Sequence, residues 1–192
     1  MIQSQDRSGY IGVSAVQLVI GNWKTKTWEK WWMQKLGINQ DHFDNVFTKA
    51  GTNWEHRILE SLHLPNLEMD RQFIIEDLRL RVNYDGTSPD MIHECKTYKW
   101  EKGFKVPKKY IQQVNLQNWV RMKKHGRPFQ AEIVAYGLQA EDYKNYLREL
   151  DPSRRQRIPV MFDQAWVERE YLPKHTILLD ALVRGVFPKE AL

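Results

Sequence analysis

Two acidic residues and a lysine lie close together in the middle of the chain, and they could bind a divalent metal ion and assist hydrolysis. Asp85 precedes Glu94 by nine positions, and Lys96 follows Glu94 by two. Mg²⁺ accepts carboxylate oxygens as ligands and leaves its other positions to water and phosphate oxygens. A metal ion held there could polarise a phosphate and lower the pKa of an attacking water. Acidic and basic side chains are also common on ordinary exposed strands, so a surface hairpin without chemistry is the alternative.

A hairpin must hold these residues, and two turns compete for its tip. Asp85-Gly86 suits a type I′ turn, but it would leave Pro89 inside the returning strand, where proline cannot donate a ladder hydrogen bond. A turn over Ser88 to Met91 instead puts Pro89 at the second turn position, where its fixed φ is favourable. We therefore expect the second turn.

In that register Asp85 would lie directly opposite Glu94, on one face of the strand pair. Two carboxylates at cross-strand distance repel each other unless a cation or a proton lies between them. Lys96, two residues beyond Glu94, would share their face, whereas the Cys95 side chain would point into the core. Only the backbone carbonyl of Cys95 could then reach the metal ion.

These residues resemble the PD-(D/E)xK nucleases, and within them the phage lambda exonuclease and YqaJ-like recombination nucleases. Asp85-Gly86 followed by Glu94-x-Lys96 looks like the family pattern of an acid and glycine, a short hairpin and Glu-x-Lys. Asp90 offers a more literal Pro-Asp, but it lies roughly 13 Å before Glu94 along a strand, too far to share an ion. The resemblance covers most of the chain. It implies a restriction-endonuclease-like α/β core, with a small mixed β-sheet flanked by helices.

Two further motifs of the family have counterparts on either side of the hairpin. Gly51-x-x-x-Glu55 looks like a helix whose carboxylate supports the metal ion, here through water, although Thr52-x-x-Glu55 is also a capping box. Tyr110-x-x-Gln113 looks like a helix whose amide positions water or phosphate. Gln112 is the neighbouring alternative for that amide, and either glutamine could be a plain exposed helix residue.

Other residues of the sequence could contact DNA. Arg7 and Ser14 resemble the arginine and serine with which lambda-type exonucleases hold a 5′-phosphate, although Ser14 could equally be a helix cap or a packed small residue. A lysine-rich stretch interleaved with aromatic residues could neutralise backbone phosphates, and its alternative is a solvated surface. The lysines of that stretch assigned to DNA are Lys99, Lys102, Lys105, Lys108 and Lys109.

The hydrophobic periodicity predicts alternating helices and strands around this segment. A Trp stripe formed by Trp28, Trp31 and Trp32 indicates a buried helix face, with Thr27 as the cap. We expect helices over residues 12–21, 27–36, 52–62, 107–124, 140–150 and 163–185, and strands over residues 73–84, 91–98, 131–136 and 158–162.

Composition limits the class of protein. The 192 residues suit one domain, so we expect a single nuclease domain over residues 1–192. Cys95 is the only cysteine, which excludes an internal disulfide and favours an intracellular, cytoplasmic setting. No apolar run is long enough for a membrane span, and the polar start lacks a signal-peptide core. A net charge of +5 suits a polyanionic partner such as DNA.

The resemblance implies a Mg²⁺- or Mn²⁺-dependent deoxyribonuclease. The first expectation is a phage-type recombination exonuclease that acts on double-stranded DNA ends, serves a single-strand annealing protein and could form a homo-oligomer. The alternatives are a structure- or sequence-directed endonuclease on the same fold and a non-catalytic DNA-binding or inhibitory relative. The intact set of Asp85, Glu94 and Lys96 argues against the last, because a binding module needs no acid pair.

Overall fold

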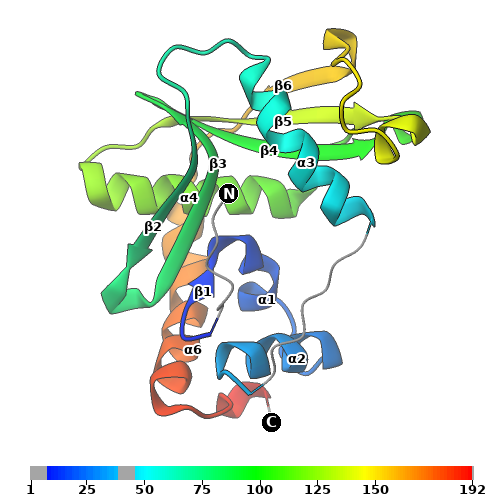
Figure 1. The fold of residues 1–192 in the computed structure, drawn as a ribbon. Coiled ribbons are helices and arrows are strands. Elements are labelled where there is room, and N and C mark those ends of the chain that lie inside the picture. The colour runs from blue at the N-terminus through cyan, green and yellow to red at the C-terminus, as the bar shows by residue number, and fades with distance from the viewer. Residues whose placement is uncertain (1–7, 39–45, 192) are drawn as a thin grey trace.

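The computed structural model describes residues 8–38 and 46–191 and forms a mixed β-sheet covered by helices on both faces (Figure 1). Arg7 lies outside the described residues, so its expected role stays a prediction.

The sheet has six strands in the order β1-β3-β4-β5-β6, and β2 pairs with β3 beside this path. Two of the strand pairs, β1 with β3 and β4 with β5, are parallel, and the other pairs are antiparallel. The expected α/β class with a small mixed sheet is therefore confirmed. The strands are β1 (Ile11–Gly12), β2 (Glu68–Ile75), β3 (Leu80–Ser88), β4 (Met91–Lys99), β5 (Gln130–Leu138) and β6 (Arg155–Pro159).

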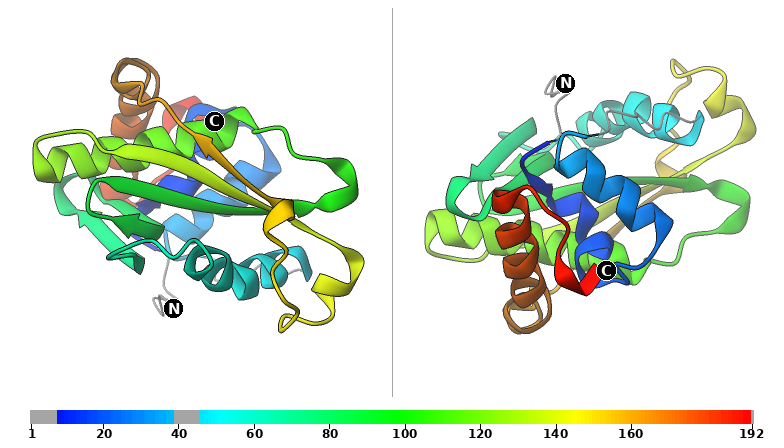
Figure 2. Two further views of the ribbon diagram at one scale, coloured as in Figure 1. Left: turned by 90° about the horizontal axis from the view of Figure 1, so that it is seen from above. Right: turned by 90° about the horizontal axis from the view of Figure 1, so that it is seen from below.

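Helix α3 covers one face of the sheet, and the remaining long helices lie on the other (Figure 2). On the α3 side, Trp54 and Ile58 pack against Val134 and Tyr136 of β5. On the other side a larger core joins α1, α2, α4 and α6 to the sheet. The helices are α1 (Val16–Ile20), α2 (Lys26–Lys35), α3 (Val46–Glu60), α4 (Lys108–His125), α5 (Gln164–Trp166) and α6 (Leu172–Arg184).

Helix α4 packs into the larger core, and a proline and a glycine mark its ends. Pro107 is the N-cap, and Gly126 ends the helix with a φ of 75°, a left-handed conformation that glycine adopts without strain. The Trp stripe of α2 is buried, as expected, with Trp28 and Trp32 stacked at 5.4 Å between ring centroids. The cap of α2 is Thr25 rather than the expected Thr27, because the Thr25 side chain accepts the Trp28 N–H.

For two segments the predicted type or number of secondary-structure elements is wrong. The single strand over residues 73–84 is the end of β2 and the start of β3, separated by a 3₁₀ turn that closes on Arg79 with a φ of 44°. The helix over residues 140–150 is only a 3₁₀ turn, Ala140–Tyr143. There the buried carboxylate of Asp142 binds Arg148 and Arg154, and these tertiary ion pairs override the local helical periodicity.

Two other elements are displaced. Helix α3 begins at Val46, six residues before the expected start at 52. The edge strand expected over residues 158–162 is Arg155–Pro159, which pairs antiparallel with β5. No helix of the described residues is both long enough and apolar enough to cross a membrane.

Candidate active site

Strands β3 and β4 form the predicted hairpin and then separate at the candidate site. The ladder pairs Ser88 with Met91, Thr87 with Ile92 and Gly86 with His93, so the expected turn and register are confirmed. The next expected pair, Asp85 opposite Glu94, is not part of the ladder. Instead the Asp85 carboxylate accepts the Cys95 N–H at 2.8 Å, so a side chain takes the place of a backbone partner. β4 stays paired with β5 along its whole length, and its other edge opens toward the site.

Glu94 is at the centre of the site and has no solvent exposure. Its Oε1 atom accepts hydrogen bonds from Lys96 Nζ and, at 2.5 Å, from Gln113 Nε2. Its Oε2 atom accepts a third from Gln117 Nε2 at 2.6 Å. The structure thus brings Glu94, Lys96 and Gln113 together, and it adds Gln117, which the sequence reasoning missed. The signal was available, because Gln117 follows Gln113 by four residues and so shares its face of α4.

Asp85 and Lys96 complete the charge arrangement around Glu94. Burial raises the pKa of Asp85 well above its usual range, and the charge of Glu94 raises it further. Burial alone would lower the pKa of Lys96, but the carboxylates of Glu94 and Asp85 outweigh it and raise that pKa. Lys96 therefore stays protonated and can donate to an anion.

Glu55 approaches the same site from α3 on the α3 face of the sheet. Burial, followed by the charge of Glu94, raises the pKa of Glu55 to about 7. Because α3 begins at Val46, Glu55 lies in the helix interior and not in its first turn. The capping-box interpretation of Thr52 and Glu55 is therefore wrong, and a capping role no longer accounts for the carboxylate.

A cleft of about 410 Å³ opens between α3, β4 and the N-terminal end of α4. Glu55 and Lys96 reach it from two sides, and Tyr110 closes a third. Lys96 Nζ lies 5.2 Å from the centre of the Tyr110 ring. The remaining lining residues are Gly51, Thr52, Cys95 and Thr97.

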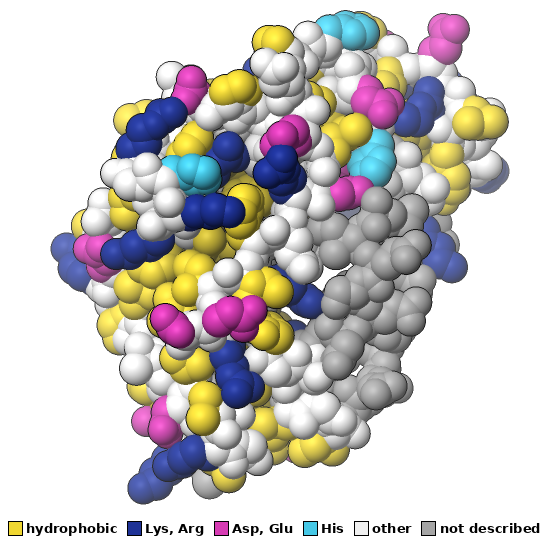
Figure 3. All heavy atoms as spheres, turned by 60° about the vertical axis from the view of Figure 1, so that its left-hand side comes forward, with side chains coloured by type: hydrophobic (Ala, Val, Ile, Leu, Met, Phe, Trp, Pro, Cys, Tyr) yellow, Lys and Arg dark blue, Asp and Glu magenta, His cyan; other side chains and the backbone are white. Residues whose placement is uncertain are grey.

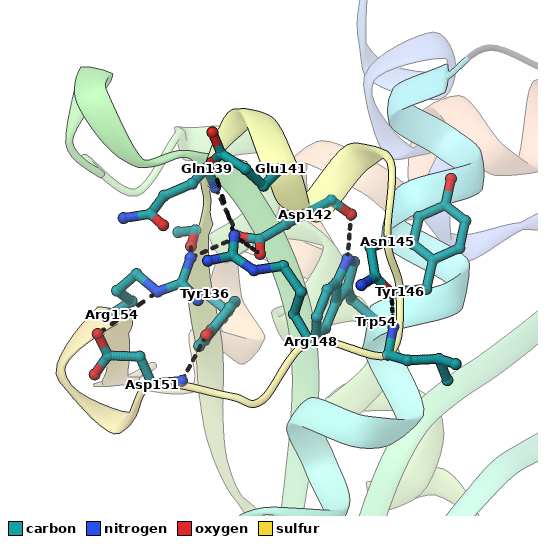
Figure 4. Close-up of polar contacts among 12 residues, drawn as sticks. Trp54, Tyr136, Gln139, Glu141, Asp142, Asn145, Tyr146, Arg148, Asp151 and Arg154 are labelled. Atoms are coloured by element: carbon teal, nitrogen blue, oxygen red, sulfur yellow. Dashed lines mark hydrogen bonds and ion pairs between the residues drawn. The ribbon is translucent and has the colours of Figure 1, made fainter.

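A buried ionic cluster fixes α3, and thereby Glu55, against the sheet (Figure 4). Asp142 accepts hydrogen bonds from Arg148 at 2.8 Å and from Arg154 at 2.5 Å, and its backbone carbonyl accepts the Trp54 indole N–H at 3.0 Å. Arg57, one turn further along α3, stacks on Trp54 at 4.6 Å. Trp54, which precedes Glu55 in the chain, is thus bonded to the backbone of a residue whose buried carboxylate is held by two arginines.

A second set of potential metal ligands adjoins Glu55. One ligand atom each of Glu55, His56 and Asp70 lie within 4.8 Å of one another. His56 Nε2 is 3.0 Å from Asp70 Oδ2. The sequence reasoning missed His56 and Asp70, because β2 was not expected to begin before residue 73.

The remaining expected residues lie outside this cluster. Gln112 binds Gln17 of α1 at 2.5 Å, which separates it from Gln113. Asp90 is exposed in the turn, where it forms an ion pair with Arg127. Ser14 is exposed in the 3₁₀ turn before α1, which contacts α4. The lysines expected to contact DNA are all exposed, namely Lys99, Lys102, Lys105, Lys108 and Lys109.

Comparisons with known proteins support the fold. No family model matches the chain, and no curated protein matches it. Among solved structures, an alkaline exonuclease from Laribacter hongkongensis superposes with a TM-score of 0.66 at 17% sequence identity, over 92% of this chain and 89% of that one. This chain has an exonuclease fold. A candidate exonuclease from Eubacterium rectale gives a TM-score of 0.59 at 11% identity, over 96% of this chain and 85% of that one.

The likeness spans nearly the whole of all three proteins, so it does not rest on the hairpin alone. The expected resemblance to lambda-type PD-(D/E)xK nucleases is confirmed at the level of the fold. At these identities the chemistry of this chain has to be argued from its own residues.

Proposed function

We propose that the protein is a divalent-metal-dependent DNA nuclease that hydrolyses phosphodiester bonds in the cleft beside Glu94. The observation that carries the proposal is the charge imbalance of the site. Three carboxylates, from Asp85, Glu94 and Glu55, influence one another there, and Lys96 forms an ion pair with Glu94. Such clusters with pKa values raised by like charge are characteristic of functional sites.

The donor set fits Mg²⁺ or Mn²⁺. The site offers oxygen ligands without thiolate or buried imidazole, which is the preference of hard divalent cations. The Cys95 thiol is no alternative ligand, because burial raises its pKa well above the usual range and keeps it protonated. Asp85, Glu94 and the Cys95 carbonyl would hold the ion, and Glu55 would support it through water. The bound ion would supply a polarised phosphate and a water of lowered pKa.

The chain's own groups would act around that ion. Lys96 would donate to a phosphate oxygen and stabilise the negative charge that grows there during hydrolysis. Gln113 and Gln117 hold the two oxygens of Glu94 in place without adding charge. Tyr110 and Thr52 line the wall against which the substrate would lie.

The substrate proposal is narrower still. We infer an exonuclease that acts on double-stranded DNA ends, as in phage-type recombination, with Ser14 and Arg7 near the 5′-phosphate and the exposed lysines from Lys99 to Lys109 on the backbone. A single-strand annealing protein would take the product, and a homo-oligomer is compatible with this role. The two structural neighbours, an exonuclease and a candidate exonuclease, favour this proposal over the endonuclease.

The proposal is tested by incubating the protein with linear or covalently closed DNA in the presence of Mg²⁺ and following degradation of the DNA over time. An exonuclease degrades the linear form and spares the closed circle, whereas an endonuclease opens the circle. A non-catalytic binder retards both forms in a gel and degrades neither, and this outcome would remove the enzymatic proposal.

The Glu94→Ala variant is the control for contaminating nucleases. It should fold and leave both substrates intact. Equal degradation by the wild type and Glu94→Ala would show that the activity belongs to another protein or another site.

A further inference from the structure

The C-terminal end of α4 carries a group of cations far along the helix from the cleft. Lys123, Lys124 and His125 end the helix, Arg127 follows it, and all four are exposed. Arg121 lies one turn earlier and is partly buried. Figure 3 brings forward the left-hand side of Figure 1, where this end of α4 and the β2–β3 hairpin lie, and Lys and Arg side chains gather on it.

Arg121 has an unusual environment for a partly buried guanidinium. Its Nε and Nη1 atoms are buried and have no hydrogen-bond partner among the described residues. Its Nη2 atom makes one long bond, of 3.4 Å, to the carbonyl oxygen of Ser88 at the hairpin turn. The guanidinium stacks on Phe129 at 4.1 Å. A buried donor without an acceptor costs free energy of folding, and the acceptors that best suit an arginine are a carboxylate and a phosphate.

The surroundings of Arg121 do not supply that anion. The nearby carboxylates are already paired, Glu68 with Arg71 at 2.6 Å and Asp90 with Arg127. Burial, Arg121, Lys124 and Arg127 all lower the pKa of His125, which reports a positive potential at this end of the helix. An anion would therefore be attracted to this surface.

The helix dipole explains only part of this group. Cations in the last turn of a helix gain roughly 0.3–1 kcal/mol each, which accounts for Lys123, Lys124 and His125. Arg127 lies beyond the end of the helix. Arg121 gains little from the dipole because it precedes the last turn, to which the effect is confined.

One face of α4 connects this surface with the cleft. Tyr110, Gln113, Gln117 and Arg121 follow one another at intervals of three or four residues and so lie on one stripe. The stripe contacts Glu94 through its glutamines and the hairpin turn through Arg121. Eleven residues separate Gln113 from Lys124, or roughly 16 Å of helix at about 1.5 Å per residue. That length equals the axial rise of about five base pairs of a DNA duplex, at roughly 3.4 Å each.

We propose that Arg121, Lys124 and Arg127 form a second phosphate-binding surface, which holds the DNA backbone about five base pairs along the duplex axis from the phosphate in the cleft. The proposal rests on the proposed function for the identity of the polyanion. It adds a binding region that is independent of the metal site and of the lysines between Lys99 and Lys109.

The test is the salt dependence of binding to a duplex of about 20 base pairs in a metal chelator, where cleavage cannot occur. Each lost phosphate contact reduces the slope of log K against log salt by about 0.9. The variant R121Q/K124Q/R127Q should therefore lose between two and three units of slope. The matched control K26Q/K30Q/K189Q changes the charge equally at exposed positions around α2 and the C-terminal end, and its slope should equal that of the wild type.

Equal slopes for the two triple variants would overturn the proposal. Failure of the wild type to bind duplex at low salt would instead remove the proposed function, so the two failures are distinguishable. If R121Q disturbs folding, the double variant K124Q/R127Q replaces the triple variant in the test, because it changes only two exposed residues. Its expected loss is one to two units of slope.

Neutral methylphosphonates give the position of the contact. Introduced one at a time along each strand in turn, they should weaken wild-type binding at phosphates about five base pairs along the duplex axis from the one held in the cleft. The triple variant should lose this sensitivity and keep the sensitivity at the cleft. A wild-type profile without that second position would contradict the proposal.

Discussion

Strand β4 has a carboxylate cluster on each side, and the two clusters differ in whether their charge is balanced. On one side Glu132 of β5 accepts His93 Nδ1 at 2.7 Å and two donors of Arg157 at 2.8 and 2.9 Å. Burial would raise the pKa of Glu132, but the bonds to His93 and Arg157 outweigh it and lower that pKa. On the other side, starting from the very next residue, Glu94 lies near Asp85 and Glu55, and burial with like charge raises the pKa of both neighbours.

This difference separates scaffold from function. A buried carboxylate that is matched by cations stabilises the fold as it is, as Asp142 also does with Arg148 and Arg154. A cluster with more carboxylates than cations is stable only if protons or a bound cation complete it. The position of the missing cation is therefore the proposed position of the metal ion.

The largest expected effect is on cleavage. Asp85→Asn keeps the size of the side chain and an oxygen that can accept the Cys95 N–H. It removes a charged ligand from the cluster of Asp85, Glu94 and Glu55, which is the unbalanced side of β4. We expect the single-turnover rate with Mg²⁺ to fall on the order of 10³-fold or more, the scale of losing a group that stabilises transition-state charge. Asp90→Asn, in the exposed turn, is the matched control and should cleave at close to the wild-type rate. The reverse result would transfer the role from Asp85 to Asp90.

The next effect is on stability, and it should have opposite signs on the two sides. Glu132→Gln leaves His93 and Arg157 without their carboxylate and should cost about 2–4 kcal/mol of unfolding free energy. Asp85→Asn removes like-charge repulsion and should stabilise the metal-free protein. Urea denaturation at pH 8 with a chelator measures both. Equal losses of stability in both variants would show that other groups already balance the charge around Asp85.

Divalent metal should stabilise the unbalanced side alone. At 100 times its Kd, a ligand that binds only the native state adds about 2.7 kcal/mol. We expect Mg²⁺ or Mn²⁺ to raise the Tm of the wild type and of Glu132→Gln, and to leave Asp85→Asn nearly unchanged. His56→Gln separates the two sets of ligands around Glu55. If it alone abolishes the shift, the ion binds at Glu55, His56 and Asp70 rather than at Glu94.

The sequence predicted the hairpin well because local rules determine it. Pro89 cannot lie in a strand interior, because it has no N–H to donate. The turn at Ser88 to Met91 then determines which residues of the two strands lie opposite each other. The same reasoning failed one residue pair further, at Asp85. There β3 leaves β4 while it stays paired with β2, and near its start it pairs with β1; the partners of a splayed strand are set by tertiary packing.

The parts of the site that the sequence missed depend on contacts between distant segments. Gln117 lies 23 residues from Glu94, and its only local signal is that it follows Gln113 by four residues on the same helix face. Helix α3 and the short turn at Ala140–Tyr143 are linked by the bond from Trp54 to Asp142, across 88 residues. Local propensity carries no information on such pairs. The resemblance placed Glu55 on a helix beside the metal site, but it did not give the position of Glu55 within that helix.

The smallest expected effect is a pH dependence that belongs to the unbalanced side. The pKa of Glu55 is about 7 in the folded protein against 4.5 for an ordinary glutamate, so the native state binds more protons than the unfolded state between these values. Stability therefore falls as pH rises through that window, by about 1–2 kcal/mol. The raised pKa of Asp85 acts in the same direction.

Urea denaturation of the metal-free protein at pH 5 and pH 8 measures this effect, and Glu55→Gln isolates it. The variant should be more stable relative to the wild type at pH 8 than at pH 5, because it cannot acquire the charge that Glu94 opposes. Glu132→Gln should not show this gain, since the pKa of Glu132 is lowered and its charge is already matched. An equal difference between Glu55→Gln and the wild type at both pH values would mean that Glu55 titrates normally, and that the imbalance is confined to Asp85 and Glu94.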